Sequence, residues 1–457
     1  MNRAPKNHYQ LGRRPSGLTR RRLLQGTAGL SAAAALQAGR WRHAGAQEFS
    51  GDLTVWGVVS FTTEGDELLA AQMNEWGEAN GVNVEYVPQQ GSDYQVKLAT
   101  AVEAGAVPDI AMMQGDLTHF YAAQDRLVDL SDLFDRIKDQ AGGMWEPLLP
   151  HVQVDGKTFS IPMETDVSVM YARLDLVEEA TGTRIPPATL DELEAVAREI
   201  NNPPRLFGIG LALGRSPDAV ANVEQMIFAE GGTLVDEQGN PAIDNAGTVL
   251  ALTRIKRWWE DSLIPPDATA WDDSSNNKAY QSGQVAFTFN PASIFAFLEE
   301  NDPELLGNTT QAPFPAGTAG SFPLIGTWSW AIFQESSNID AAKALIEYIM
   351  EPERLQAVYE EVGGRWYPVY KDLVEAEFWQ SRPFFEPFPE IIENGRREWY
   401  PAEATPLLLT QLSAVFQRFI LADMAQAVVV SGTSPEQAAA EAQIAMEQVF
   451  EELAAEQ

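Results

Sequence analysis

The chain has 457 residues and a formal net charge of −34, from 65 acidic and 31 basic residues. This acidity argues against nucleic acid and anionic membrane surfaces as partners, because both would repel the protein. The chain has no cysteine, which excludes disulfides and a lipid carried on an N-terminal cysteine.

The first 46 residues are basic, with eight Arg, one Lys and no acidic residue. Three arginines, Arg20 to Arg22, precede an apolar stretch at 23–39 that is too short to span a membrane. The segment 19–25 resembles the twin-arginine export consensus, and Ala44-Gly45-Ala46 supplies small residues for a signal peptidase. We therefore predict a twin-arginine signal over 1–46, cleaved after Ala46, rather than a disordered basic tail.

Removing the signal lowers the formal net charge from −34 to −43, because nine basic residues leave with it. Such acidity suits either a saline habitat, where salt screens the repulsion, or solubility alone. We expect no second apolar segment after residue 47 and predict a free periplasmic protein that is not lipid-anchored.

Strands and helices alternate along the mature chain. The first series has strand 53–59, helix 66–80, strand 82–87, helix 93–103 and strand 109–113. The second has strand 168–171, helix 189–200, strand 207–213, helices 219–229 and 248–261, and strand 285–289. This alternation predicts parallel sheets covered by helices on both faces. Because 411 mature residues exceed what one core usually organises, we expect an α/β fold with two doubly wound lobes.

The remaining segments predict one hairpin and a helical C-terminal third. The hairpin is expected at 232–243, with its turn at 236–240, and its oxygen-bearing residues lack the spacing of a calcium loop. Long helices are expected at 339–350, 410–430 and 435–455.

Few residues in the mature chain suit catalysis or metal binding. His119 and His151 are its only histidines, and the usual hydrolase, zinc and phosphate-loop motifs are missing. The glycines at 208–214 lack the spacing of a dinucleotide fingerprint. Glu164 and Asp166 could form the acid and base of a glycosidase, but two residues apart on a strand they would lie too close together. We predict no catalytic residue, no metal and no cofactor.

Loops at the carboxyl ends of strands are the expected ligand site, since ligands of open parallel sheets bind there. This rule selects Phe61 after the first strand, Gln114 and Asp116 after the third, and Asn290 after strand 285–289.

Tryptophans in predicted loops are candidate ligand contacts, because their ring faces suit the C–H faces of sugars. They are Trp271, Trp328, Trp366 and Trp399, and ordinary packing is the alternative for each. Trp258 and Trp259 lie within a helix and are expected in the core.

Four stretches carry a resemblance to a known family. They are Ala-Gly-Ala-Val-Pro-Asp-Ile at 104–110, Asp-Gly-Lys-Thr-Phe-Ser-Ile-Pro at 155–162, Thr-Leu-Asp-Glu-Leu-Glu-Ala-Val-Ala-Arg-Glu-Ile at 189–200 and Gly-Thr-Trp-Ser-Trp-Ala-Ile at 326–332. In this order they resemble the extracellular solute-binding proteins of ABC importers, of the sugar-binding type, from about Asp52 to the C-terminus.

The resemblance implies a type II periplasmic-binding-protein fold, in which three chain crossings form a hinge between the lobes. We place the crossings near Glu164, Gln311 and Trp366. The N-terminal lobe would then comprise 47–163 and 312–367, and the C-terminal lobe 164–311 and 368–457.

The resemblance also implies site residues. Asp116 falls where relatives have a polar contact after the Pro-Asp strand, and Glu164 and Asp166 fall in the first crossing. Trp328 matches an aromatic of the Gly-Thr-Trp turn. Trp366 and Tyr367 lie in a segment that returns to the cleft.

A monomeric binding protein is the implied function. It would capture a neutral carbohydrate or polyol between its lobes and deliver it to the permease subunits of an ABC importer, without catalysis. One alternative is a polyamine or other cation, and a second is a secreted polysaccharide hydrolase. One or two carboxylates with several amides in the cleft would favour a sugar, whereas three or more carboxylates boxed by aromatics would favour an amine.

Overall fold

The computed structural model describes residues 49–60, 62–89, 91–397 and 404–455. The chain divides into two units, Met1–Phe49 and Ser50–Gln457, and the description below concerns the second. The predicted export signal, Phe61 and Trp399 lie outside the described residues.

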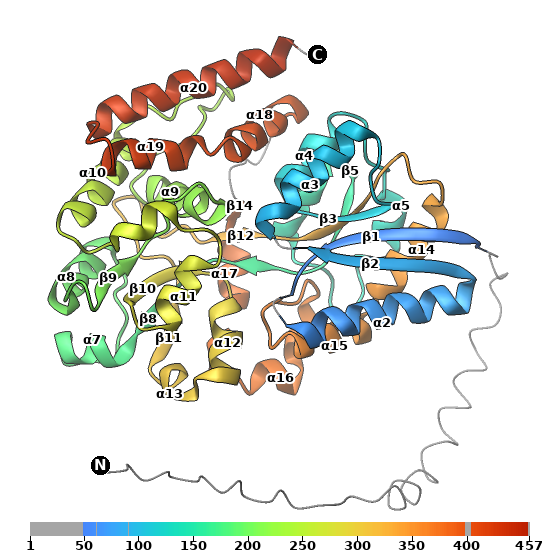
Figure 1. The fold of residues 1–457 in the computed structure, drawn as a ribbon, viewed down its shortest axis with the longest axis horizontal. Coiled ribbons are helices and arrows are strands. Elements are labelled where there is room, and N and C mark those ends of the chain that lie inside the picture. Colours follow the sequence, from blue (N-terminus) through green and yellow to red (C-terminus); the bar gives the residue numbers. More distant parts are fainter. Residues whose placement is uncertain (1–48, 61, 90, 398–403, 456–457) are drawn as a thin grey trace, which may run out of the picture. The chain divides into compact units, whose positions relative to one another are not determined.

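A five-stranded sheet organises the first lobe, in the order β2-β1-β3-β13-β6. Its strands are β1 (Gly51–Val58), β2 (Val82–Gln89), β3 (Ile110–Met113), β6 (Ser160–Pro162) and β13 (Ser329–Ile332). Figure 1 shows α3 (Gly91–Ala104) and α4 (Gly115–Ala122) on one side of this sheet and α2 (Thr63–Asn80) and α15 (Pro352–Glu361) on the other. Helix α14 (Ile339–Ile349) packs against α2.

A four-stranded sheet organises the second lobe, in the order β11-β8-β10-β9. Its strands are β8 (Val169–Arg173), β9 (Phe207–Gly210), β10 (Val285–Asn290) and β11 (Thr309–Ala312). Every residue of β9 and β10 is buried, as expected for central strands covered on both faces. The helices around this sheet are α7 (Leu174–Thr181), α8 (Leu190–Ile200), α9 (Pro217–Ala229), α10 (Ala246–Glu260), α11 (Ser275–Gln281), α12 (Ser293–Asn301) and α13 (Pro303–Leu306).

Helix α8 begins where the sequence predicts. Thr189 accepts a hydrogen bond from the backbone of Glu192, and the Glu192 side chain accepts one from the backbone of Thr189, which completes a capping box.

Both sheets are mixed, which corrects the expectation of parallel sheets. Strand β1 is parallel to β2 and β3, but β13 is antiparallel to β3 and β6. Strand β10 is parallel to β9 and antiparallel to β8. The alternating pattern predicts direction only within a strand-helix-strand unit. Strands β8 and β13 follow crossings between lobes, so their direction is set by how the chain returns.

Three crossing segments meet in a small third sheet, in the order β14-β12-β7. It contains β7 (Asp166–Val167), β12 (Leu324–Gly326) and β14 (Arg396–Arg397). The crossing predicted near Gln311 therefore lies further along the chain, since Gln311 belongs to β11 and β12 carries the chain back to β13.

The C-terminal helices are α18 (Pro406–Gln417), α19 (Ile420–Val429) and α20 (Pro435–Ala455). Helices α19 and α20 pack on α9 and α10 of the second lobe, whereas α18 packs on α4 of the first. The single helix predicted at 410–430 is divided in two at Phe419, whose φ of 59° is left-handed.

The segment Pro406–Val429 is apolar enough to cross a membrane by length and composition, contrary to the expectation of no such segment after residue 47. In the fold, 67% of its most apolar window is buried inside the protein. It is therefore a pair of core helices.

The turn at 236–240 forms as predicted, but the hairpin is closed by a single antiparallel bridge between Val235 and Pro241. Asp236 Oδ1 accepts hydrogen bonds from the backbone of Gln238 and Asn240. The remaining short elements are α5 (Ser131–Ile137), η1 (Glu146–Leu148), α6 (Leu149–Val152), β4 (Gln153–Val154), β5 (Lys157–Thr158), η2 (Pro266–Ala270), η3 (Lys371–Glu375), α16 (Glu377–Gln380), η4 (Pro383–Phe385) and α17 (Phe388–Asn394).

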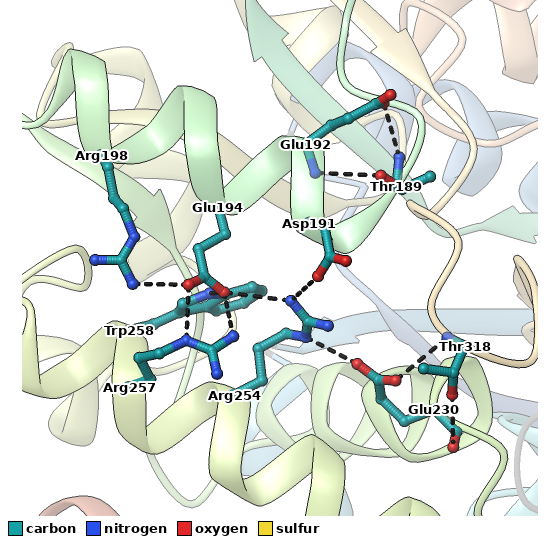
Figure 2. A network of polar contacts seen from close by, with 10 residues as sticks. All are labelled: Thr189, Asp191, Glu192, Glu194, Arg198, Glu230, Arg254, Arg257, Trp258 and Thr318. Carbon is teal, nitrogen blue, oxygen red and sulfur yellow. Dashed lines mark hydrogen bonds and ion pairs between the residues drawn. The ribbon is translucent and has the colours of Figure 1, made fainter.

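A network of ion pairs fastens the helices of the second lobe to one another (Figure 2). Arg254 of α10 bonds the buried carboxylate of Glu230 at 2.8 Å, and Glu230 also accepts the backbone N–H of Thr318 at 3.2 Å. Glu194 of α8 accepts hydrogen bonds from Arg254 and from Trp258 Nε1. The network thus ties α8 and α10 to the loop that leads to β12.

Candidate ligand-binding site

A cavity of about 280 Å³ lies where the two lobes and the crossing segments meet. The first lobe contributes the ends of β1 and β3, the second lobe the start of α9 and the end of β10, and the crossings the remainder. The lining residues are Val58, Val59, Gln95, Gln114, Glu164, Asp166, Pro217, Asp218, Asp272, Asp273, Ser274, Asn277, Asn290, Pro291, Ser293, Trp328, Arg365 and Trp366.

A smaller cavity of about 60 Å³ adjoins it and shares Gln114, Asp166, Pro217, Asp218, Asn290 and Pro291. A separate cavity of about 580 Å³ lies between the 236–241 turn and helices α18 and α20. That cavity shares no lining residue with the other two, and strand ends contribute nothing to it.

Two of the residues selected at strand ends line the main cavity. Gln114 follows β3, and Asn290 ends β10. Asn290 is held in place on both sides, because its Nδ2 donates to Ser293 Oγ at 2.6 Å and its Oδ1 accepts from Asn276 Nδ2 at 3.0 Å.

Asp116 lies outside both of these cavities. It is the second residue of α4 and is 1% exposed, and Gln417 of α18 approaches its Oδ2 at 3.5 Å. Burial raises the pKa of Asp116 to about 6, although the backbone N–H of Leu117 and the Gln417 amide lower it. The carboxylate therefore faces the contact between α4 and α18.

Trp328 and Trp366 line the main cavity from two different crossings. Trp328 is half-buried and packs edge-to-face on Tyr94, with ring centroids 6.3 Å apart. Trp366 is 2% exposed and lies beneath the guanidinium of Arg365, 5.8 Å from its ring centroid.

Trp271 and Tyr367 do not line the cavity. Trp271 follows η2 and is buried against the backbone of Gly214. The ring of Tyr367 packs in an aromatic cluster with Trp379 and Phe388, each about 5.1 Å away between centroids. Loop position alone did not separate these buried rings from those at the cavity, because tertiary packing decides it.

Hydrogen bonds join the three crossing segments beside the cavity. Glu164 is 1% exposed, and its Oε1 accepts the backbone N–H of Trp328 at 2.9 Å. Thr327 Oγ1 donates to the backbone oxygen of Glu164 at 2.6 Å. Thr165 donates its backbone N–H to Tyr367 at 2.8 Å. The crossings predicted at Glu164 and Trp366 therefore lie side by side.

The crossing carboxylates are electrostatically coupled to each other and to one arginine. Burial raises the pKa of Glu164 well above its usual range, and the neighbouring Asp166 raises it further. Burial also raises the pKa of Asp166 to about 6. Arg365 opposes both shifts through its positive charge, and burial lowers the pKa of Arg365 itself.

A second group of carboxylates lies on the second lobe and was missed from the sequence. Asp218 stands in the first turn of α9, and its Oδ2 accepts Asn276 Nδ2 at 2.9 Å. Asp272 and Asp273 follow η2, and Asp272 Oδ1 accepts the hydroxyls of Ser274 and Ser275. The strand-end rule could have found Asp218, because the loop after β9 leads directly to it.

The second-lobe carboxylates perturb one another. Burial raises the pKa of Asp218 well above its usual range, and Asp273, Asp166 and Asp272 raise it further, while Asn276 lowers it. Burial raises the pKa of Asp273 to about 6, although the backbone N–H of Asp218 lowers it. Among the described residues, no group of three acidic or histidine side chains could hold a metal ion.

A family model described as "Bacterial extracellular solute-binding protein" matches residues 71–387. The chain belongs to this family. Its membership makes it an exported binding protein. A Deinococcus radiodurans relative described as a "probable ABC transporter-binding protein" is 24% identical over 353 residues, which cover 75% of this chain and 81% of the relative.

Two solved structures share the fold of this solute-binding protein. Maltose-bound MalE3 of T. maritima has a TM-score of 0.76 at 20% identity, covering 87% of this chain and 100% of that one. An ABC transporter solute-binding protein from Agrobacterium radiobacter K84, in complex with ribitol, has a TM-score of 0.75 at 20% identity, covering 87% and 98%. The predicted periplasmic-binding-protein fold is confirmed.

Proposed function

We propose that the protein binds a carbohydrate or polyol, predicted as neutral from the sequence, in the cavity between its lobes and delivers it to the permease of an ABC importer. It acts as a free, monomeric periplasmic protein, exported through its twin-arginine signal, and catalyses nothing. The lobes close over the ligand by motion at the three crossing segments, as in other periplasmic binding proteins.

The composition of the main cavity carries this proposal. Two tryptophan rings, Trp328 and Trp366, lie beside four side-chain amides and five carboxylates, which are Gln95, Gln114, Asn277, Asn290, Glu164, Asp166, Asp218, Asp272 and Asp273. Aromatic faces supply contact area for sugar C–H groups, while amides and carboxylates bond hydroxyls and fix orientation. The relatives of the same fold that hold maltose and ribitol support a polyhydroxylated ligand.

The hydrolase alternative has less support. Glu164 is engaged by the backbone of Trp328 and is 1% exposed, so it is poorly placed to exchange a proton with a substrate. The cation alternative gains from the number of carboxylates and is developed in the next subsection.

A thermal-shift screen with maltose, ribitol, mannitol and glucose, followed by calorimetric titration of the best ligand, tests the proposal. A ligand at 100 times its dissociation constant stabilises the folded protein by about 2.7 kcal/mol. Stabilisation by at least one sugar or polyol is expected. Turnover of a polysaccharide, measured as released reducing sugar, would overturn the binding-only function.

A further inference from the structure

We infer that the hydroxylated ligand of this cavity carries a protonated amine, which binds against Asp218 and Asp273 of the second lobe. The inference rests on the proposed function, because it concerns the same cavity. It refines the neutral ligand expected from the sequence to an amino sugar or amino polyol.

The distribution of charge around the cavity is uneven. Five carboxylates line it with one basic residue, Arg365. Arg365 lies with the crossing segments, where its charge favours ionised Glu164 and Asp166. Within the described chain, neither Asp218 nor Asp273 forms a salt bridge, and the neighbouring carboxylates oppose the ionisation of Asp218. A cation from the ligand would relieve this repulsion.

Unfilled hydrogen-bond acceptors lie in the same place. Asp273 Oδ1 and Asn277 Oδ1 are both buried and accept no hydrogen bond from any described residue, and both side chains line the cavity. A buried acceptor without a donor is costly. An ammonium group offers three donors and no acceptor, so it matches this side of the cavity better than a hydroxyl does.

Asn222 provides the complementary observation. It lies one helical turn after Asp218 on α9, is 3% exposed and lines the adjoining smaller cavity. Its Nδ2 makes no hydrogen bond within the described part of the chain. That amide can donate to a hydroxyl oxygen beside the amine. A donor site next to an acceptor site fits a ligand with amino and hydroxyl groups on nearby carbons.

Matched pairs of probes test the inference on the purified full-length protein by calorimetric titration at pH 7.5. The pairs are glucosamine against glucose, and 1-amino-1-deoxysorbitol against sorbitol, with N-acetylglucosamine as an uncharged amide control. We expect each amine to bind at least tenfold tighter than its neutral partner, and N-acetylglucosamine to lose that advantage.

Substitution of the two aspartates tests the location of the amine. Asp218→Asn and Asp273→Asn keep side-chain size and remove charge, so each should reduce the ratio of amine to neutral affinity several-fold. Asp267→Asn removes a charge from an exposed residue of η2 that does not line the cavity, and should keep the wild-type ratio. Circular dichroism shows whether each variant is folded.

The outcomes separate this inference from the proposed function. Equal affinities within each pair, or an amine preference that survives both substitutions, would overturn the inference and leave the proposed function standing. Binding of neither amines nor neutral sugars and polyols would overturn both. If only the Asp218 and Asp273 variants lose the preference, the inference is supported.

Discussion

Glu164 and Trp328 are 164 residues apart in the sequence, yet Glu164 Oε1 accepts the backbone N–H of Trp328 at 2.9 Å. The bond joins the first chain crossing to the one that returns the chain to β13, and it fixes the backbone that carries a cavity-lining ring. Since burial raises the pKa of Glu164, the neutral form is favoured, and an amide should replace it well.

Glu164→Gln should therefore leave the free energy of unfolding nearly unchanged, whereas Glu164→Ala should lower it by about 1–3 kcal/mol, because the Trp328 N–H loses its acceptor. Urea denaturation measures both values. Equal destabilisation by both substitutions would show that the negative charge of Glu164 is itself required.

Trp328→Ala should weaken binding of the best sugar from the screen by about 1–3 kcal/mol, the usual loss for a central aromatic anchor. The fold should persist, because Trp328 is only half-buried. Trp366→Ala should weaken binding and also destabilise the protein, since Trp366 is 2% exposed. Trp258→Phe is the control, because Trp258 is buried in α10 and should change stability alone. Unchanged affinity in the Trp328 variant would remove that ring from the site.

Arg254→Ala should lower the free energy of unfolding by about 3–5 kcal/mol. The substitution leaves Glu230, whose side chain is 2% exposed, without its charged partner in the network of Figure 2. Lys256→Ala is a matched control on the same helix, because Lys256 pairs with the exposed Glu260 at 2.8 Å and should cost less than about 1 kcal/mol. Equal losses in the two variants would contradict the importance of the network.

The ligand-free protein should become more stable to heat as the pH falls from 7 to 5. Asp166 and Asp273 have pKa values raised to about 6, against about 3.9 in an unfolded chain, so between these values the folded state binds more protons. Stability from these groups is therefore gained on acidification and lost as the pH rises through 6. Asp116, with its pKa of about 6, adds to the trend.

The high net charge of the protein produces a trend in the same direction, so variants are needed to separate the two. Asp166→Asn and Asp273→Asn should raise the melting temperature at pH 7 and flatten its rise towards pH 5. Asp267→Asn should keep the wild-type slope. Identical slopes in all four proteins would assign the trend to net charge alone.

Replacing Arg20 and Arg21 together by Lys should block export, because a twin-arginine receptor reads the guanidinium pair and not basic charge in general. Cell fractionation and immunoblotting of the two compartments measure this. Normal periplasmic accumulation of the double variant would show that another pathway exports the chain.

Local pattern predicted the elements and part of the cavity. Thr189 and Glu192 show the start of α8 in the sequence itself, and strand ends led to Gln114 and Asn290. Asp218 and Asp273 were missed because an acidic residue in the first turn of a helix, or in a turn, usually has a local role. Only the packing of α9 against the loop after η2 reveals that these carboxylates gather at one cavity. The direction of β13 likewise depends on a distant crossing.

The position of β13 between β3 and β6 has a consequence for synthesis and folding. While the ribosome is still making the second lobe, β3 and β6 each lack a neighbour, and their open edges can pair with other chains. The first lobe therefore cannot reach its native state until residues 329–332 have been made, and pairing over so long a stretch of sequence is slow. A fragment that ends before residue 329 should not fold its first lobe. An export route that accepts folded chains suits this protein, since it postpones translocation until the last strand is in place.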